Sequence, residues 1–272
     1  MTATRSDRAA QAPSPDRAPW RAVALPSEHG GWGLTLEPVV LGLVVAWSSA
    51  GVALGVAAFA AFLVRTPLKL VVVDLRRERW LDRSRLAMRF AAVELLVMAA
   101  AAVVAVAWSG WSWLVPVGIA SPFVAVEVWF DVRSRGRRLA PELCGAVGIA
   151  AIVAAIVVAG AHDGRLAVAL WLVLAGRAVG AIPFVRVQIQ RLRRGVGPRW
   201  QSDLAQLISV GVGVVAVAFD GRALAGAVGL MALGALQSVW VRMAPIPARR
   251  IGLRQMVLGL SLVAATAVGV SW

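Results

Sequence analysis

The stretch GVALGVAAFAAFLVRTPLKLVVVDLRRERWLDRSRLAMR, residues 51–89, decides the fold of this chain. Its first part, residues 51–73, is apolar and long enough to cross a bilayer as a helix, which takes about 20 residues. Its second part carries six arginines: Arg76, Arg77, Arg79, Arg83, Arg85 and Arg89. Basic residues stay on the cytoplasmic side of a membrane, so this stretch predicts a membrane-spanning helix that ends in the cytoplasm.

The same alternation repeats along the chain and predicts an all-α, polytopic membrane protein with nine transmembrane helices. The predicted spans are 34–49, 51–73, 90–108, 111–130, 143–160, 166–187, 204–219, 222–241 and 251–271. Arginines precede the first span and follow the second, fourth, sixth and eighth, whereas the opposite connections hold only Arg165 and Arg222. This asymmetry predicts a plasma (inner) membrane protein with a cytoplasmic N-terminus and an extracytoplasmic C-terminus.

The composition limits the possible classes of function. With 60% hydrophobic residues the chain is too apolar for a soluble nucleic-acid-binding protein, although its net charge is +14. We therefore expect the arginines to contact membrane lipid headgroups, and we do not expect the protein to bind nucleic acid. Cys144 is the single cysteine, which excludes a disulfide or a thiolate metal site within one chain. Residues 1–22 are predicted to be a disordered tail, and residues 23–272 are predicted to form one transmembrane domain. The sequence does not predict how many copies of the chain associate.

Charged residues inside the spans mark candidate interior sites, since each costs roughly 2.5–3.5 kcal/mol at mid-depth. Arg177 lies half-way along span 166–187, and Arg65 and Lys69 share one face of span 51–73. Glu37 and Glu94 lie early in two other spans. One interpretation pairs these glutamates with Arg65 or Arg177. The three cations outnumber the two glutamates, so pairing leaves a surplus of positive charge. The alternative interpretation is therefore a pocket that binds an anion.

Carboxylates at a spacing of four suggest a metal site at the cytoplasmic helix ends. Asp74, Glu78 and Asp82 would line one face if the second helix continued through them, and Glu127 and Asp131 show the same spacing after the fourth span. Such hard oxygen ligands suit Mg²⁺ together with a substrate phosphate. The alternative is ordinary local pairing with neighbouring arginines, which is common at helix ends.

The block PSEHGGWG, residues 26–33, precedes the first span. Its glycines allow close approach of a neighbour or a ligand. Glu28 and His29 are either an acid–base pair, with His29 also a candidate metal ligand, or structural residues. Two glycine pairs elsewhere, Gly51 with Gly55 and Gly176 with Gly180, are typical of close helix packing.

Three blocks resemble the YwiC-like family of bacterial membrane proteins. They are PSEHGGWG at 26–33, GR at 176–177 and IPFVR at 182–186. The likeness extends over nearly the whole chain after the tail, and the first block is its most specific part.

The layout also resembles the UbiA-type intramembrane prenyltransferases, and this implies a UbiA-like nine-helix bundle. Segments 33–38, 74–82 and 137–145 fall where that superfamily has its first-helix entry, its first Asp-rich motif and the entry to its fifth helix. In those enzymes Mg²⁺ bound by Asp-rich motifs holds an isoprenoid diphosphate, and the isoprenoid chain is transferred to an acceptor. The chain departs from the pattern at Val73, where Asn is usual, and after the sixth span, where no carboxylate occurs before Asp203.

The resemblance implies an enzyme of prenyltransferase type or a relative that binds an isoprenoid or lipid diphosphate. The implied metal ligands for Mg²⁺ are Asp74, Glu78 and Asp82. The implied diphosphate contacts are Arg65, Lys69, Arg177 and Arg186. Glu28 and His29 would take a proton from the acceptor, and Glu127 and Asp131 form a secondary acidic pair. The alternatives are a non-enzymatic transporter or lipid-binding scaffold, and a peripheral role in which the basic face recruits anionic lipid or an acidic partner.

Overall fold

Every regular element in the computed structural model is helical within the described residues, 19–24, 29–78, 80–133 and 138–271, which confirms the predicted all-α fold. The elements are α1 (Pro19–Ala24), α2 (His29–Val45), α3 (Ser49–Arg76), α4 (Asp82–Ser109), α5 (Leu114–Val132), α6 (Leu139–Ala161), α7 (Gly164–Arg194), α8 (Arg199–Phe219), η2 (Gly221–Ala223), α9 (Leu224–Trp240) and α10 (Ala248–Ser271). The nine predicted spans correspond in order to α2–α10. The prediction of a disordered tail over 1–22 is wrong for residues 19–22, which belong to the helix α1, and its residues 1–18 lie outside the described residues.

Within the described residues, eight helical segments are long and apolar enough to cross a membrane: α3–α8, η2 together with α9 (Gly221–Trp240), and α10. The remaining predicted span, α2, has 17 residues and is therefore about 25 Å long. Connected helices alternate in direction. Helices α3, α5, α7 and α9 finish at one end of the bundle, which we call the basic end because their following segments carry the arginines. Helices α2, α4, α6, α8 and α10 finish at the opposite end.

Tryptophans mark both ends of the bundle. Trp47, Trp108 and Trp111 are exposed at the opposite end, and Trp129 and Trp200 are exposed near the basic end. Indole rings are enriched at the two membrane–water interfaces because one part of the ring is apolar and its N–H is polar. Their separation along the helices agrees with a bundle that spans a membrane.

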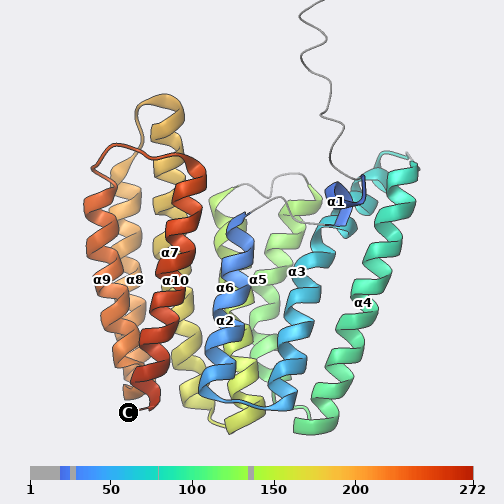
Figure 1. Ribbon diagram of the computed structural model, residues 1–272, viewed down its shortest axis with the longest axis horizontal. Helices are drawn as coiled ribbons and strands as arrows, with labels where there is room; N and C mark the ends of the chain where they lie inside the picture. The colour runs from blue at the N-terminus through green and yellow to red at the C-terminus, as the bar shows by residue number, and fades with distance from the viewer. Residues whose placement is uncertain (1–18, 25–28, 79, 134–137, 272) are drawn as a thin grey trace, which may run out of the picture.

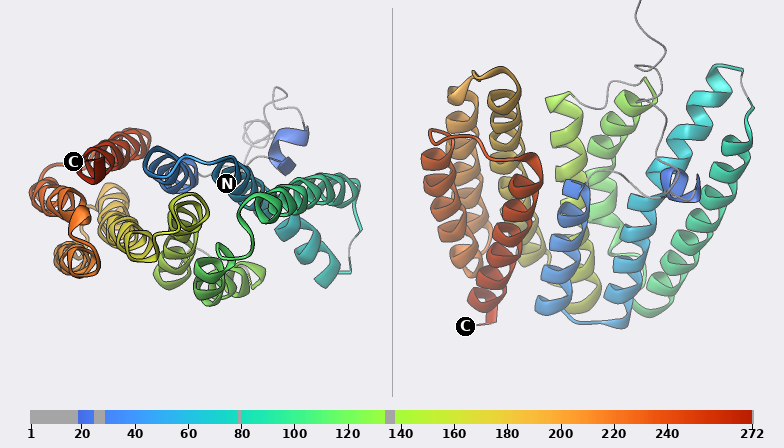
Figure 2. Two further views of the ribbon diagram at one scale, coloured as in Figure 1. Left: turned by 90° about the horizontal axis from the view of Figure 1, so that it is seen from below. Right: turned by 45° about the horizontal axis from the view of Figure 1, so that its top comes forward.

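The bundle is elongated, with α8 and α9 at one edge and α4 at the other (Figures 1 and 2). Helices α6 and α7 form its centre, since 61% and 72% of their most apolar windows are buried, against 17–33% in the other long helices. Helix α2 contacts α10, so the first and last of the predicted spans lie side by side. Leu41, Val153, Leu170 and Val263 join α2, α6, α7 and α10 in one apolar core.

Small residues bring α2, α3 and α6 into close contact. Ile156 of α6 packs between Gly42 and Gly51, where an added Cβ would lie 2.9 Å from Ile156 side-chain atoms in each case. Nearer the opposite end, a Cβ on Gly160 would lie 2.6 Å from the backbone oxygen of Ala46. Real Cβ atoms do not approach oxygen so closely, so α2 and α6 touch here only because residue 160 is glycine.

The predicted glycine packing pairs are confirmed. A Cβ on Gly55 would lie 2.9 Å from the Val39 side chain of α2. A Cβ on Gly176 would lie 3.2 Å from the Ser209 carbonyl oxygen of α8, and one on Gly180 would also meet the Ser209 side chain, at 3.3 Å. Helix α7 therefore meets α8 along a strip of small residues, as is usual between membrane helices.

Candidate functional site

The predicted diphosphate-binding cations of α3 pair with the predicted secondary acidic residues of α5. Arg65 Nε donates to Asp131 Oδ2 at 2.6 Å, and its Nη1 lies 2.5 Å from Glu127 Oε1. Lys69 Nζ lies 3.3 Å from Asp131 Oδ1. Asp131 is buried, whereas about two fifths of each cationic side chain is exposed. We call these four residues the α3–α5 ion-pair cluster.

Helix α6 leaves room for this cluster at Gly145. A Cβ on Gly145 would lie 2.2 Å from the Glu127 carboxyl carbon. Glu127 therefore lies between Arg65 and the backbone of α6 at Gly145. The sequence shows the spacing of the charged residues, but it does not predict that α6 packs against them. The cluster ties three helices together near the basic end.

Asp74 forms a second polar contact, which joins the end of α3 to the start of α4. Its Oδ1 and Oδ2 accept from Arg83 Nη2 at 2.9 Å and Nε at 3.2 Å. The hydroxyl of Ser84 donates to Oδ2 at 2.7 Å and accepts from the N–H of Leu81 at 3.2 Å. The bidentate pairing and the hydroxyl fix the α3–α4 connection.

The prediction that Asp74, Glu78 and Asp82 line one helical face is wrong. Helix α3 ends at Arg76, Glu78 has a positive φ of 52°, and Asp82 is the first residue of α4. The arginine-rich turn therefore separates the carboxylates instead of stacking them. Within the described ranges no three His, Cys, Asp or Glu residues gather to hold a metal ion. Because Asp74 already accepts from Arg83 and Ser84, the residues present do not fit the predicted Mg²⁺ site.

Glu37, Arg177 and Gln255 form a polar cluster in the middle of the bundle, where α2, α7 and α10 meet; we call it the central cluster. Arg177 Nη2 donates to the Gln255 backbone oxygen at 2.7 Å and lies 4.0 Å from Glu37 Oε1. Both charged side chains are buried. A Cβ on Gly259 would lie 1.7 Å from Glu37 Oε1, so α10 makes room for this carboxylate. The interpretation that Glu37 pairs with Arg177 is confirmed.

Several donors and acceptors of the central cluster have no hydrogen-bond partner in the described part of the chain. They are Nε and Nη1 of Arg177 and both amide atoms of Gln255. Glu94 of α4, predicted with Glu37 as a partner for the cations in the spans, has an unpartnered Oε2 and makes no ion pair among the described residues. Buried polar groups in proteins are normally paired, so the central cluster can bind a further polar group.

The remaining predicted site residues are Arg186, Glu28 and His29. Arg186 of α7 pairs with Glu142 of α6 at 2.8 Å. Glu28 lies outside the described residues, and His29 is the first residue of α2, with its side chain also outside the description. The structure therefore brings predicted site residues together in the α3–α5 ion-pair cluster and in the central cluster. The Arg186–Glu142 pair joins α7 to α6, with Glu142 three residues before Gly145, and the carboxylates of 74–82 belong to the α3–α4 connection.

The C-terminal part of α7 carries polar contacts that sequence reasoning missed. Gln188 Nε2 donates to the backbone oxygen of Trp240 at 2.9 Å. The buried guanidinium of Arg191 donates to the carbonyls of Val241 and Met243. A cation at a helix C-terminus pairs with free carbonyls and interacts favourably with the negative end of the helix dipole. Arg191 of α7 therefore caps the C-terminal end of α9. Arg191 resembles its basic neighbours in the sequence, and nothing in the pattern singles it out.

A comparison with known protein families identifies the first part of the membrane domain. Residues 25–157 match the YwiC-like protein family. The match covers just under half of the chain and confirms, over these residues, the family resemblance read from the sequence. No curated protein and no solved structure gives a significant match. The UbiA-like arrangement stays a prediction.

The YwiC-like region contains α2–α5 and most of α6. It includes Glu37 and the whole α3–α5 ion-pair cluster, but it ends before Arg177 and Gln255. The central cluster is thus shared between the YwiC-like region and the helices that follow it.

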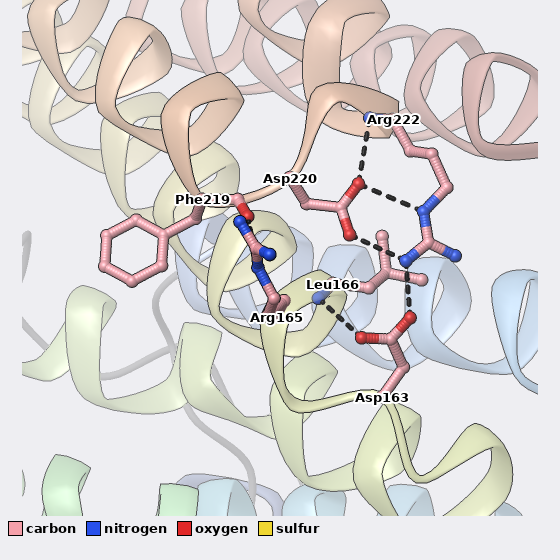
Figure 3. A network of polar contacts seen from close by, with 6 residues as sticks. All are labelled: Asp163, Arg165, Leu166, Phe219, Asp220 and Arg222. Atoms are coloured by element: carbon pink, nitrogen blue, oxygen red, sulfur yellow. Dashed lines mark hydrogen bonds and ion pairs between the residues drawn. The ribbon is translucent and has the colours of Figure 1, made fainter.

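Beyond the YwiC-like region, a carboxylate–arginine clasp closes the opposite end (Figure 3). Arg222 contacts Asp220 with its Nε at 3.0 Å and its Nη2 at 2.6 Å, and Nη2 also pairs with Asp163. Asp163 in turn accepts from the N–H of Leu166 at 3.0 Å and caps α7. The clasp joins the α6–α7 and α8–α9 connections.

The two arginines of the opposite end thus have structural roles. Arg165 donates to the backbone oxygen of Phe219 at 3.0 Å, beside the clasp formed by Arg222 (Figure 3). The signal for this arrangement is present in the sequence, because Asp163 and Asp220 are close neighbours of the only two arginines in these connections.

Because of this clasp, we expect the folded protein to lose stability in acid. Hydrogen bonds from Arg222 hold the pKa of Asp163 and the pKa of Asp220 below the ordinary aspartate value. The clasp therefore stabilises the folded state above pH about 3.9, and this stabilisation is lost as the pH falls further, through the lowered pKa values. We expect the unfolding temperature of the wild type to fall more steeply over this range than that of Arg222→Gln. Parallel curves in thermal unfolding would contradict the role of the clasp.

Proposed function

We propose that this membrane protein binds the phosphate group of an isoprenoid phosphate or diphosphate within the membrane, with Arg177 as the principal contact and the basic end facing the cytoplasm. The observation that supports this most strongly is the buried guanidinium of Arg177, whose Nε and Nη1 have no partner among the residues described. An unpaired buried donor costs about 1–3 kcal/mol. Each of these two free N–H donors can make a charge-assisted hydrogen bond to a phosphate oxygen.

The neighbours of Arg177 complete this site. The free amide of Gln255 supplies a further donor on α10. Glu37 already balances the charge of Arg177, so an anion that enters brings excess negative charge. Protonation of Glu37 removes this excess, and ligand binding is then coupled to uptake of a proton.

The depth of the site indicates an amphiphilic ligand. Arg177 lies near the middle of α7, among helices whose outer faces are apolar. A ligand that reaches it from the bilayer needs an apolar chain, and the resemblance to UbiA-type enzymes favours an isoprenoid. Metal-dependent transfer of that chain has less support, because the carboxylates of 74–82 are separated and Asp74 is paired.

A scaffold without a ligand is the second candidate. It is favoured by the pairing of the other predicted phosphate contacts, since Arg65 and Lys69 meet Glu127 and Asp131, and Arg186 meets Glu142. In that case water partners the free donors of Arg177.

The test is binding of farnesyl diphosphate and of a long-chain polyprenyl phosphate to the detergent-purified full chain, in EDTA and in Mg²⁺. We expect binding in EDTA that weakens at least about tenfold in Arg177→Lys, which keeps the charge but loses the planar fork. Arg165→Gln, an exposed substitution on the same helix, should bind like the wild type. Glu37→Gln mimics the protonated carboxyl and should bind more tightly.

Each contrary result has a clear meaning. Equal binding by Arg177→Lys and the wild type, or no binding by a folded wild type, would overturn the proposal in favour of the scaffold. Binding that requires Mg²⁺ and is lost in Asp74→Asn would instead place the ligand at the α3–α4 connection.

A further inference from the structure

A groove on the outer face of α8 and α9 lies apart from the central cluster. It has a volume of about 350 Å³ and is open along one side. Leu207, on its wall, is 71% exposed, so the groove faces the surroundings of the bundle. Gln206 forms part of the groove and is fixed there, since its amide donates to the Gly180 carbonyl and to Gln237.

The groove is polar at the basic end and apolar away from it. Asp203 and Arg242 form a bidentate pair at the polar end, with Nη1–Oδ1 and Nη2–Oδ2 distances of 2.9 Å and 3.0 Å. This pair lies where α8 begins and α9 ends, which is the depth of the lipid headgroups. Gly234 lies eight residues before Arg242, about 12 Å deeper along α9. Leu207 and Val210 line the apolar part.

The shape and the charges of the groove fit a lipid with a zwitterionic headgroup. Asp203 and Arg242 neutralise each other, so the pair attracts neither a simple anion nor a simple cation strongly. A headgroup with one charge of each sign replaces both partners at once: its phosphate binds Arg242, and its ammonium N–H groups donate to Asp203. The Arg242 side chain is 54% exposed and the Asp203 side chain 32% exposed, so both are accessible to a headgroup.

We propose that this groove binds a phospholipid with a primary ammonium headgroup, its phosphate on Arg242, its ammonium on Asp203 and one acyl chain along Leu207 and Val210. A quaternary ammonium has no N–H to donate and should bind less well. This site is independent of the phosphate site proposed at Arg177.

The depth of the groove depends on Gly234. A Cβ on Gly234 would make ordinary 3.6 Å contacts with Gln206 and Val210, so alanine fits there, and a larger side chain would extend into the groove. Gly211 of α8 is the matched control, because it is exposed and nothing lies within 4 Å of an added Cβ.

The experiment measures retained lipid by native mass spectrometry. Purified full-length protein is delipidated and exchanged with phosphatidylethanolamine, phosphatidylcholine or phosphatidylglycerol of identical acyl chains. We expect one phosphatidylethanolamine to be retained about tenfold more strongly than phosphatidylcholine. Asp203→Asn should abolish this preference, Gly234→Leu should remove the bound lipid, and Gly211→Leu should leave it in place.

Three results would overturn the proposal: equal retention of the three lipids, a preference for phosphatidylglycerol, or lipid binding unchanged in Gly234→Leu. A lipid-free dimer that dissociates in Gly234→Leu would show that a second copy of the chain occupies the groove. Arg177→Lys should leave lipid retention unchanged, so failure here and failure at the central cluster can be told apart.

Discussion

Arg177→Gln is expected to lower the free energy of unfolding by about 3 kcal/mol, because it leaves Glu37 buried without a counter-charge. Glu37 and Arg177 are each only 4% exposed, so water cannot compensate from outside the bundle. The double variant Glu37→Gln/Arg177→Gln removes both charges together. It should recover more than half of the loss, since a buried ion pair is often replaceable when no lone charge remains.

The measurement is equilibrium unfolding in mixed micelles with increasing SDS, followed by circular dichroism, with the four proteins of the double-mutant cycle. Arg194→Gln on the same helix serves as the control and should change stability by about 0.5 kcal/mol or less, because its side chain is exposed. If the double variant is as unstable as the sum of the two single variants, the Glu37–Arg177 pair does not act as a unit.

Gly160→Ala should destabilise the protein by about 1–3 kcal/mol, the usual cost of forcing an extra group into a packed core. The atom nearest to the new methyl group would be the backbone oxygen of Ala46, at 2.6 Å. A backbone oxygen cannot turn aside as a side chain can, so α2 and α6 must move apart.

Gly164→Ala, four residues further along, provides the comparison. Nothing lies within 4 Å of an added Cβ at this first residue of α7, and alanine favours helix more than glycine does. This variant should be as stable as the wild type or slightly more so in the same SDS titration. Equal stability of both variants would mean that α2 and α6 separate without cost.

The spans were predictable because each buries or presents about 20 apolar residues to lipid, and because arginine marks alternate ends. The first and last residues of the helices were harder to predict. Helix α4 begins at Asp82, although its apolar run starts near residue 90, and α7 continues to Arg194, beyond the predicted end at 187. Polar residues are tolerated where a helix extends past the hydrocarbon, so hydropathy does not mark such ends.

The polar contacts between helices were predicted only in part. The shared face of Arg65 and Lys69 follows from their spacing, but their partners Glu127 and Asp131 depend on how α3 and α5 pack. Pairing of Glu37 with Arg177 was one of several combinations that charge alone allowed. Gln255 gave no signal, because its backbone carbonyl, which any residue has, accepts from Arg177.

The central cluster also bears on how the chain is made. Glu37 belongs to α2, the first of the predicted spans, Arg177 to the central helix α7, and the carbonyl that accepts from Arg177 to α10. A nascent chain still lacking α10 has inserted both charges but not the groups that enclose them. Premature release from the ribosome would therefore leave a charged, incompletely covered surface in the lipid, which membrane proteases and chaperones could distinguish from the finished protein.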